Sequence, residues 1–494
     1  MGHLRKIFIF LFVFQVIFLT AQTPFVCDGR YFATTENRLS EIIIDWESDT
    51  FWLEPFGEIL PRKIDAIGYN STDNFIYGLS KFGKKNIFYQ IDATGKAFPI
   101  DTLQFDSNLW NPLIKGGAFA KTGEFIFSLK SETAIDAPNG IVILDPQNPS
   151  DFSVTEATIL GTNPLIFIED FSEDPVDELM WAVQHYLEFE DNPDSSFLQN
   201  FNAHNCFSAI DPFAATVDNA SFEALPNYIF THGHITTMFH NSFNELFGQR
   251  LTEVYQFDVN KNTVKKIKID RIEHTLDGCS CPYTLKIRQI VSPEITYPCT
   301  EIIYTFPIAN FTQNDQTNII FKDTFPEYFK ILEVIRNPFG GSVSGLNSGE
   351  LTITNMYVPK GIDSIQVRVL LPEIKTGIFE NQAWLKNVNL TGTNDLRTEI
   401  ASDYPPTFEK DDPTPLEIIP FEVEVTGENL VICKDSSARL KPLELLDNLD
   451  ILWSNGSTDS ILTVFKPGIF GVTVSAGCNA DSAEFEVIKS TFKI

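Results

Sequence analysis

Residues 75–78, FIYG, and residues 89–92, YQID, form a pair of segments that recurs through the first half of the chain. In each copy an aromatic-rich segment precedes a second one that ends in an apolar residue followed by Asp. The second segments close with Asp45, Asp92, Asp145, Asp211 and Asp258. The intervals between these Asp residues, about 47 to 66 residues, are close to the length of a four-stranded β-propeller blade, with an insertion in the longest. Because one blade buries its faces only against its neighbours, the repeat predicts a β-propeller of about five blades over residues 23–275.

The repeated Asp has a simple structural interpretation. Asp often begins a turn, where its carboxylate accepts hydrogen bonds from backbone N–H groups. A residue that recurs in every repeat at such a position needs no catalytic role, so we expect these carboxylates to cap turns.

The stretch AIGYNSTDNFIYG at residues 66–78 resembles the blade motif of the domain of unknown function 6923. That family is propeller-like and occurs in secreted Bacteroidetes proteins, often beside adhesion-type modules. The resemblance covers residues 25–270 and implies propeller architecture. It implies no activity and no site residue.

From residue 284 to residue 412 the pattern changes to longer alternating strands. Residues 302–310 and 318–326, together with turn signatures at residues 358–361 and 381–383, resemble the domain of unknown function 11 repeat of bacterial surface proteins. The resemblance implies an immunoglobulin-like β-sandwich over residues 276–412. Such a domain is expected to act as a spacer or presenter.

A proline- and acid-rich stretch at residues 405–415 favours an extended linker, because proline fixes φ and lacks an N–H donor. After it, Cys433, Trp453 and Cys478 follow in the order that marks the core of an immunoglobulin-like sandwich. The sequence therefore predicts a second such domain over residues 413–494, with a Cys433–Cys478 disulfide. The surroundings of the tryptophan also resemble the immunoglobulin-like modules near the C-terminus of Bacteroidetes adhesins.

The N-terminal residues 1–22 are typical of a signal peptide. Arg5 and Lys6 precede an uncharged, mostly apolar run over residues 7–19. That run is too short to span a bilayer, and no later segment is long and apolar enough. We therefore expect a protein that is secreted or held at the outer cell surface, without a transmembrane span.

Composition narrows the class of protein further. The formal net charge of -30 makes a broad basic surface for nucleic acid improbable. The 44 Phe residues favour half-buried pleated surfaces and hence an all-β fold.

Export permits disulfides among the seven Cys residues, whose odd number leaves at least one unpaired. Cys27 and Cys206 are candidates for a bridge that closes the propeller, while the partners of Cys279, Cys281 and Cys299 are left open.

Three histidines form the only cluster that suggests a metal site, namely His232, His234 and His240. On a strand the first two would point to the same face, as a metal pair requires. The alternative is a loop with a Gly turn, and no carboxylate stands at a matching short spacing. We therefore expect no cofactor, and a divalent metal bound by these histidines is the alternative.

The remaining candidates for catalytic or sugar-binding groups are acidic residues and tryptophans, and a structural role explains them better than a functional one. Glu169, Asp170, Glu173 and Asp174 offer paired carboxylates, but such charge runs usually form a solvated loop. Four tryptophans would stack on sugar rings if they lined a funnel, although propeller aromatics usually pack between blades. These are Trp46, Trp52, Trp110 and Trp181. No catalytic motif is present, so no catalytic residue is predicted.

These observations favour a binding or adhesion protein whose propeller presents a site for an extracellular glycan or protein. The alternative is an extracellular enzyme, a glycan-active or metal-dependent hydrolase with its site in the propeller funnel. A purely structural role in a surface layer is the third hypothesis.

Overall fold

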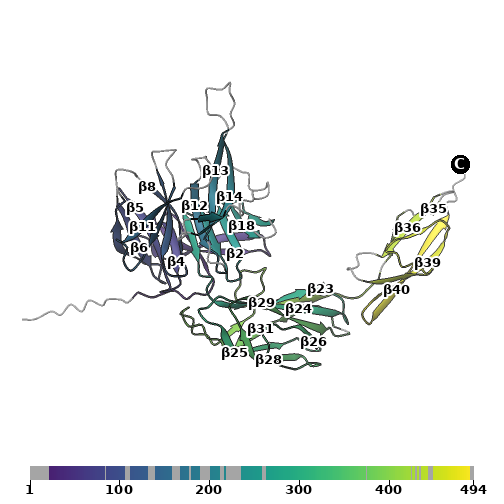
Figure 1. Ribbon diagram of the computed structural model, residues 1–494. Coiled ribbons are helices and arrows are strands. Elements are labelled where there is room, and N and C mark those ends of the chain that lie inside the picture. The colour runs from purple at the N-terminus through teal and green to yellow at the C-terminus, as the bar shows by residue number, and fades with distance from the viewer. Residues whose placement is uncertain are drawn as a thin grey trace, which may run out of the picture.

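The computed structural model describes residues 22–83, 85–105, 112–131, 139–157, 167–176, 180–189, 201–211, 216–218, 235–258, 263–373, 375–423, 425–428, 431–432, 436–442 and 449–489. All regular secondary structure in this part of the chain is β-strand, so it holds no helix able to cross a membrane. Three bodies of sheet follow one another (Figure 1). We name them the five-sheet domain (residues 22–281), the middle domain (residues 284–419) and the C-terminal domain (residues 421–489).

The five-sheet domain consists of five antiparallel four-stranded sheets. The first contains β1 (Tyr31–Thr34), β2 (Arg38–Asp45), β3 (Thr50–Ile59) and β20 (Asp277–Ser280). The second contains β4 (Asp65–Asn70), β5 (Phe75–Phe82), β6 (Lys85–Ile91) and β7 (Ala97–Leu103). The third contains β8 (Pro112–Phe119), β9 (Phe125–Ser131), β10 (Asn139–Leu144) and β11 (Phe152–Ala157). The fourth contains β12 (Phe167–Glu173), β13 (Met180–Phe189), β14 (Phe201–Asp211) and β15 (Thr216–Asp218). The fifth contains β16 (Thr237–His240), β17 (Leu246–Arg250), β18 (Glu253–Asp258) and β19 (Thr263–Lys268).

The predicted repeat corresponds to the strands of these sheets. The five segments that close with Asp are β2, β6, β10, β14 and β18, the third strand of each sheet. The predicted turn is confirmed where the Asp side chains are described in hydrogen bonds. Asp45 accepts the N–H groups of Glu47 and Ser48 at 3.0 and 3.2 Å, and Asp92 accepts that of Thr94 at 2.9 Å.

One strand from each sheet contacts its counterparts in the two neighbouring sheets. These contacts run from β4 to β8, β12, β16 and β20, and from β20 back to β4. Strand β20 pairs with β1, so the first sheet combines the beginning and the end of the domain. The predicted boundary at residue 275 is therefore too early, because the strand that completes the first sheet spans Asp277–Ser280.

Small residues and aromatic rings determine how closely the sheets pack. A Cβ on Gly278 of β20 would lie 2.1 Å from Cγ2 of Thr237 on β16, so only glycine permits this approach. Farther out, Phe88 packs against Phe125 with ring centroids 5.5 Å apart, joining the second and third sheets. Burying one such side chain contributes roughly 1.5–3 kcal/mol.

The middle domain packs several sheets around one apolar core. One sheet contains β21 (Leu285–Ile287), β22 (Ile290–Ser292), β24 (Glu301–Asn310), β26 (Lys330–Arg336) and β29 (Gly361–Leu370). Another contains β25 (Gln316–Thr324), β27 (Ser342–Ser344), β28 (Glu350–Val358), β31 (Ala383–Lys386) and β32 (Glu399–Ala401). A smaller sheet contains β23 (Ile295–Thr296), β30 (Gly377–Asn381) and β33 (Thr414–Ile418). Phe306 and Phe321, both fully buried, join the two larger sheets with centroids 4.9 Å apart.

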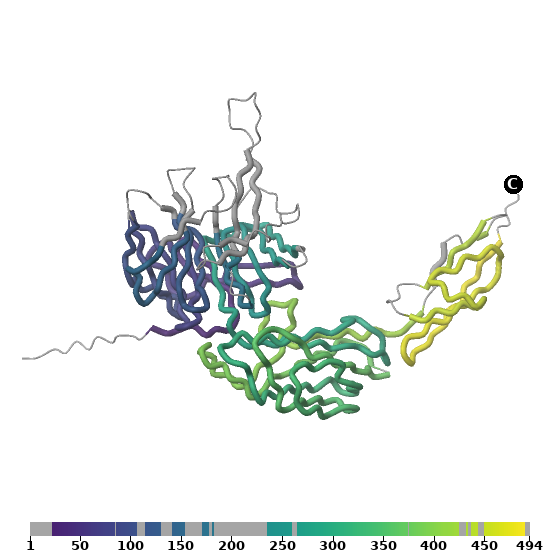
Figure 2. The backbone as a smooth tube through the Cα atoms, in the orientation of Figure 1, coloured from purple at the N-terminus to yellow at the C-terminus, as the bar shows by residue number. Residues whose placement is uncertain are grey.

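The proline-rich stretch is not a free linker, and the predicted boundary at residue 412 is too early. Strand β33 belongs to the middle domain, where it pairs with β23 and β30. The loop before it docks on the five-sheet domain, since the Pro406 carbonyl accepts the N–H groups of Trp46 and Glu47 at 2.9 and 3.0 Å (Figure 2). Proline lacks an N–H donor but keeps its carbonyl acceptor, and composition alone does not indicate which groups this carbonyl will bind.

The C-terminal domain has two small sheets. They contain β34 (Val425–Glu428), β36 (Ala438–Pro442) and β38 (Leu462–Val464), and β35 (Val431–Ile432), β37 (Asp450–Trp453), β39 (Gly468–Ala476) and β40 (Asn479–Lys489). Trp453 lies in their shared core, 1% exposed. The predicted Cys433–Cys478 disulfide is wrong, because Cys478 is bonded to Cys299 of the middle domain. Cys478 follows β39 in a turn at the edge of the domain, where it faces the neighbouring domain and not the core.

The second disulfide joins Cys27 to Cys281. It ties the segment before β1 to the residue after β20, two strands that pair in the first sheet. The predicted Cys27–Cys206 bridge is therefore wrong. Cys279 is a buried free thiol, and the side chain of Cys206 lies outside the described residues.

Candidate functional site

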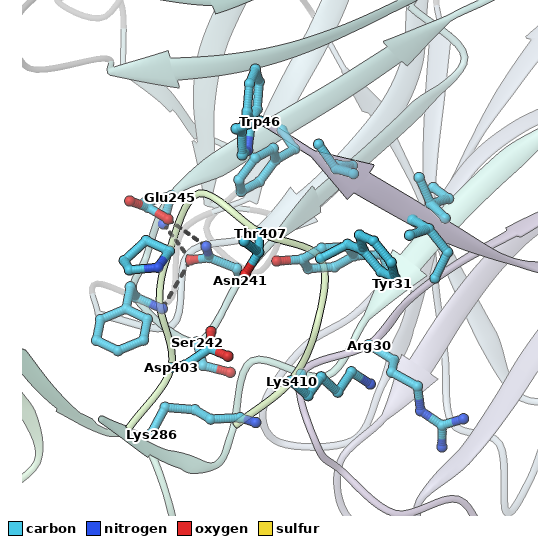
Figure 3. A pocket seen from close by; sticks show the side chains of 18 of the residues that line it. Arg30, Tyr31, Trp46, Asn241, Ser242, Glu245, Lys286, Asp403, Thr407 and Lys410 are labelled. Atoms are coloured by element: carbon cyan, nitrogen blue, oxygen red, sulfur yellow. Dashed lines mark hydrogen bonds between the residues drawn. The ribbon is translucent and has the colours of Figure 1, made fainter. Parts of the chain in front are cut away.

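The main candidate site is a pocket of about 260 Å³ where the first sheet, the fifth sheet and the middle domain meet (Figure 3). The first sheet contributes residues around Tyr31 and Trp46, and the fifth contributes the turn after β16 together with Lys265. The middle domain contributes Lys286, Arg288 and the docked loop at residues 403–410. We call this feature the interdomain pocket.

Strand alternation presents the two basic residues of the middle domain to the pocket. Leu285 and Ile287 are 1% and 0% exposed in the core. Because successive side chains of a strand point to opposite faces, Lys286 and Arg288 point away from that core and line the pocket.

The turn between β16 and β17 is shaped by one side chain. Asn241 Oδ1 accepts the N–H groups of Phe243 and Glu245 at 2.9 and 3.0 Å. Asn244 has φ of 58°, in the left-handed region that Asn tolerates. The turn thereby presents Asn241, Ser242 and Glu245 to the pocket.

A bidentate ion pair joins the two domains at one wall. Arg288 Nη1 and Nη2 donate to Glu245 Oε1 and Oε2 at 3.0 and 2.8 Å. The guanidinium also lies 3.9 Å from the centroid of the Phe243 ring. Burial alone would raise the pKa of Glu245, but Arg288 outweighs it and holds that pKa below its usual value.

Aromatic side chains form another wall. Lys265 Nζ lies 4.2 Å from the centroid of the Trp46 ring, a cation–π contact. Phe408 of the docked loop is 45% exposed and makes an edge contact with Trp52 at 5.1 Å. Trp46 packs against the buried cluster of the first and fifth sheets, as the core-packing interpretation expects, and it also lines the pocket.

The other tryptophans differ from Trp46. Trp52 packs against Phe408 and does not line the pocket. Trp181 packs against the buried cluster that contains Met238, in agreement with core packing. Trp110 lies outside the described residues.

The acidic groups of the pocket sit beside its cations. Burial raises the pKa of Asp403 to about 6, although Lys286 acts in the opposite direction. Burial likewise raises the pKa of Glu41, against the effects of Lys410 and Arg30. Lys410 Nζ lies 3.6 Å from a Glu41 carboxylate oxygen.

A pair of buried carboxyls lies among the innermost strands of the five-sheet domain. Asp170 on β12 accepts the N–H groups of Phe171 and Met238, and Asp277 on β20 accepts those of Gly278 and Ile67. Burial raises the pKa of Asp277 to about 8 and that of Asp170 well above its usual value, and the two carboxyls also hydrogen bond to each other. They join strands of different sheets and are structural groups.

The expected solvated acidic loop is wrong. Asp170, Glu173 and Asp174 are 0%, 8% and 8% exposed. The reason is that β12 is an innermost strand, enclosed by β8 and β16. Glu173 accepts the Lys121 N–H at 2.8 Å and a hydrogen bond from the Tyr283 hydroxyl. The side chain of Glu169 lies outside the described residues.

The predicted histidine cluster is described at one position only. His232 and His234 lie outside the described residues, whereas His240 is 2% exposed on β16. Its Nδ1 lies 2.8 Å from the Ser172 hydroxyl, and burial lowers its pKa to about 4. Within the described ranges, Cys299, Glu373 and Cys478 have the spacing of metal ligands, but both cysteines belong to the disulfide.

Sequence reasoning missed most of the interdomain pocket. Tyr31 and Trp46 lie in the first repeat, and their partners Lys286, Asp403 and Lys410 follow more than 200 residues later. The cationic residues lie on otherwise ordinary strands and loops. A signal was present only in the tryptophans and in the unusual proline pair at residues 405–406.

No model of a known protein family matches the chain, and a search of curated proteins found no match. Solved structures with partial likeness include the periplasmic gluconolactonase of Pseudomonas aeruginosa, at 8% identity over 68% of this chain and 99% of that one, with a TM-score of 0.30. The Dos1 propeller aligns at 8% identity over 72% and 96%, with a TM-score of 0.27. The extracellular domain of a putative one-component system from B. thetaiotaomicron aligns at 11% identity over 94% of this chain and 56% of its own length, with a TM-score of 0.28. This chain thus spans little more than half of that domain, and at such scores none of the three identifies a function.

Proposed function

We propose that this protein is a secreted or cell-surface glycan-binding protein of the adhesion type. In this proposal the five sheets form a five-bladed β-propeller, the two following domains are immunoglobulin-like, and the interdomain pocket holds the ligand. The observation that carries the proposal is a pocket of about 260 Å³ that combines aromatic faces with many polar side chains. Such a mixture suits a sugar ring, whose apolar face stacks and whose hydroxyls form hydrogen bonds.

The two disulfides support export, since disulfides persist mainly in oxidising compartments. The signal-peptide pattern of residues 1–22 agrees with this. The docked loop supports a direct role for the middle domain in binding, because residues 403–410 form part of the pocket wall.

The enzyme hypothesis has less support in the part of the chain that the structure describes. The residues that line the interdomain pocket include neither His nor Cys. The Ser172–His240 contact and the Asp170–Asp277 pair are enclosed in the five-sheet domain, away from that pocket. A binding role therefore accounts better for the polar and aromatic lining.

The test is a glycan array probed with the full mature chain, followed by titration calorimetry with the glycans that bind. Trp46→Ala and Phe408→Ala should each weaken binding at least tenfold, because they remove aromatic surface from the pocket. Phe465→Ala is the matched control, since Phe465 is 74% exposed in the C-terminal domain. Binding that both pocket variants leave unchanged would place the glycan site elsewhere, and an array without any binding would contradict the proposal.

A further inference from the structure

We propose that the ligand of the interdomain pocket is a carboxylate-bearing sugar, a uronic acid residue. Its carboxylate would lie against Lys286 and Ser242, beside Gly29. This inference rests on the proposed function and specifies the substrate class of the same site.

Two buried donor atoms beside the pocket have no hydrogen-bond partner among the described residues. Ser242 is 4% exposed, and its Oγ has no hydrogen-bond partner among the described residues. The same holds for Nε of Arg288, whose two Nη atoms are engaged by Glu245. An enclosed donor without a partner costs about 1–3 kcal/mol, so a ligand that supplies acceptors gains from meeting it.

Lys286 is a third donor at this end of the pocket, and burial lowers the pKa of its ammonium, against the effect of nearby carboxylates. The side chain is partly buried in the pocket wall, and no hydrogen bond or ion pair joins it to another described residue. Asp411, Asp403 and Asp28 act on it only through longer-range electrostatics. Removing a cation from water without a partner is unfavourable, and an anionic ligand relieves that penalty.

Gly29 lets the backbone before β1 lie close to Ser242 and Lys286, at a position where a side chain would clash with Ser242. A Cβ on Gly29 would lie 2.9 Å from Ser242 Oγ and 3.7 Å from Lys286 Cε. Its φ of +84° also disfavours any other residue. Gly29 precedes β1, Ser242 lies in the β16–β17 turn and Lys286 lies on β21. Three segments of the chain therefore meet at this position.

The charge of the pocket contrasts with that of the chain. Five of the 36 Lys and Arg residues line it, namely Arg30, Lys265, Lys286, Arg288 and Lys410. With a net charge of -30, most of the surface repels anions. Five carboxylates line the pocket as well, namely Asp28, Glu41, Glu245, Asp403 and Glu409, so its lining is close to neutral. An acidic sugar therefore meets less repulsion here than over the acidic remainder of the protein.

Two of the five acids that line the pocket bear on the type of anion that it accepts. Asp403, with a pKa of about 6, and Glu41 both lie near the cations. They would repel a phosphate dianion more strongly than a carboxylate monoanion. They also provide acceptors for sugar hydroxyls.

Trp46 completes the fit to a sugar. Figure 3 shows its ring at one end of the pocket, with Lys286, Arg30 and Lys410 at the other end. A ligand that meets both Trp46 and Lys286 must therefore span the pocket, which a simple carboxylate such as acetate would not do.

The experiment is titration calorimetry of the full mature chain with two matched pairs of ligands. Methyl glucuronide is compared with methyl glucoside, and methyl galacturonide with methyl galactoside, since each pair differs only in the carboxylate. At least one uronide should bind tenfold or more tightly than its neutral partner. Lys286→Met should abolish that preference, whereas Lys330→Met, at an exposed position on β26, should preserve it.

Ser242→Ala should reduce uronide affinity several-fold without changing the Tm, because the Ser242 hydroxyl has no partner to lose. Equal affinities within both pairs would overturn the carboxylate assignment, as would tighter binding of the corresponding sugar 6-phosphates or an acetate affinity equal to that of the uronides. Array binding restricted to neutral glycans, and lost in Trp46→Ala, would overturn this inference and preserve the proposed function. An array without binding would overturn both.

Discussion

Asp170 and Asp277 hydrogen bond to each other within the five-sheet domain, although they lie on strands of different sheets, β12 and β20. Each carboxyl also accepts the N–H of a strand in a neighbouring sheet, Met238 on β16 and Ile67 on β4. This pair therefore connects four of the innermost strands. Because burial raises the pKa of both carboxyls, we expect the stability of the domain to depend on pH.

The stability of the protein should fall as the pH rises from 7 to 9. The folded-state pKa of Asp277 is about 8, above the value of about 3.9 in an unfolded chain, so the folded state binds more protons in this range. For each proton that the folded state binds in excess, the free energy of unfolding falls by up to about 1.4 kcal/mol for every unit by which the pH rises. Below pH 6.5 the buried His240, with its lowered pKa, acts in the opposite direction. Denaturant titrations at pH 7, 8 and 9 measure the effect.

Asp277→Asn supplies the control for that titration, because an amide has no proton to lose. The variant should be less stable at pH 7 but should show a flatter dependence between pH 7 and pH 9. An identical slope in the variant and the original protein would show that other groups carry the pH dependence.

Removing the Cys27–Cys281 disulfide should destabilise the five-sheet domain. The bridge links two residues that are 254 positions apart in the sequence. It joins the beginning and the end of the domain beside the first sheet, where β1 pairs with β20. A native disulfide typically contributes about 2–4 kcal/mol. Cys27→Ser with Cys281→Ser should therefore lower the Tm, and dithiothreitol should lower the Tm of the original protein similarly. A pair variant that melts at the original temperature would contradict this role.

The Cys299–Cys478 disulfide should restrain the C-terminal domain against the middle domain. Asn479 also donates to the Pro298 carbonyl, so two adjacent residues hold this junction. Peptide mapping under non-reducing conditions should recover a peptide pair that contains Cys299 and Cys478. After Cys299→Ser with Cys478→Ser, small-angle scattering should show a larger radius of gyration. Recovery of Cys433 bonded to Cys478 would refute the interdomain bridge.

Asp403→Asn should raise affinity for a uronide several-fold. The change removes a negative charge beside Lys286, while Asn keeps the oxygen that accepts the Asp411 N–H at 3.0 Å. Calorimetry with methyl glucuronide and methyl galacturonide measures the effect, and the neutral glycosides are the control. Unchanged or weaker uronide binding would show that Asp403 does not face the ligand.

The sequence allowed the repeated strands to be recognised because each copy carries a local pattern. The aromatic-rich segments and the segments that close with Asp45 or Asp92 are adjacent strands of one sheet. Turn formation by these Asp residues is likewise a local property. Such features need no knowledge of distant contacts.

The errors concern contacts between distant parts of the chain. Cys281 meets Cys27 only because β20 returns to β1, and Cys478 meets Cys299 only because two domains touch. The charge run around Asp170 predicts a solvated loop, whereas β12 lies between β8 and β16. The interdomain pocket was missed for the same reason, apart from Trp46, because Lys286 and its neighbours come from separate domains.

The central claim is that the interdomain pocket binds a glycan through Trp46 and recognises its carboxylate through Lys286. Titration calorimetry with a uronide and its neutral glycoside tests it most directly, in the original protein, Trp46→Ala and Lys286→Met. We predict that Trp46→Ala weakens both ligands and that Lys286→Met removes only the preference for the uronide. Binding of both ligands with unchanged affinity in both variants would contradict the claim.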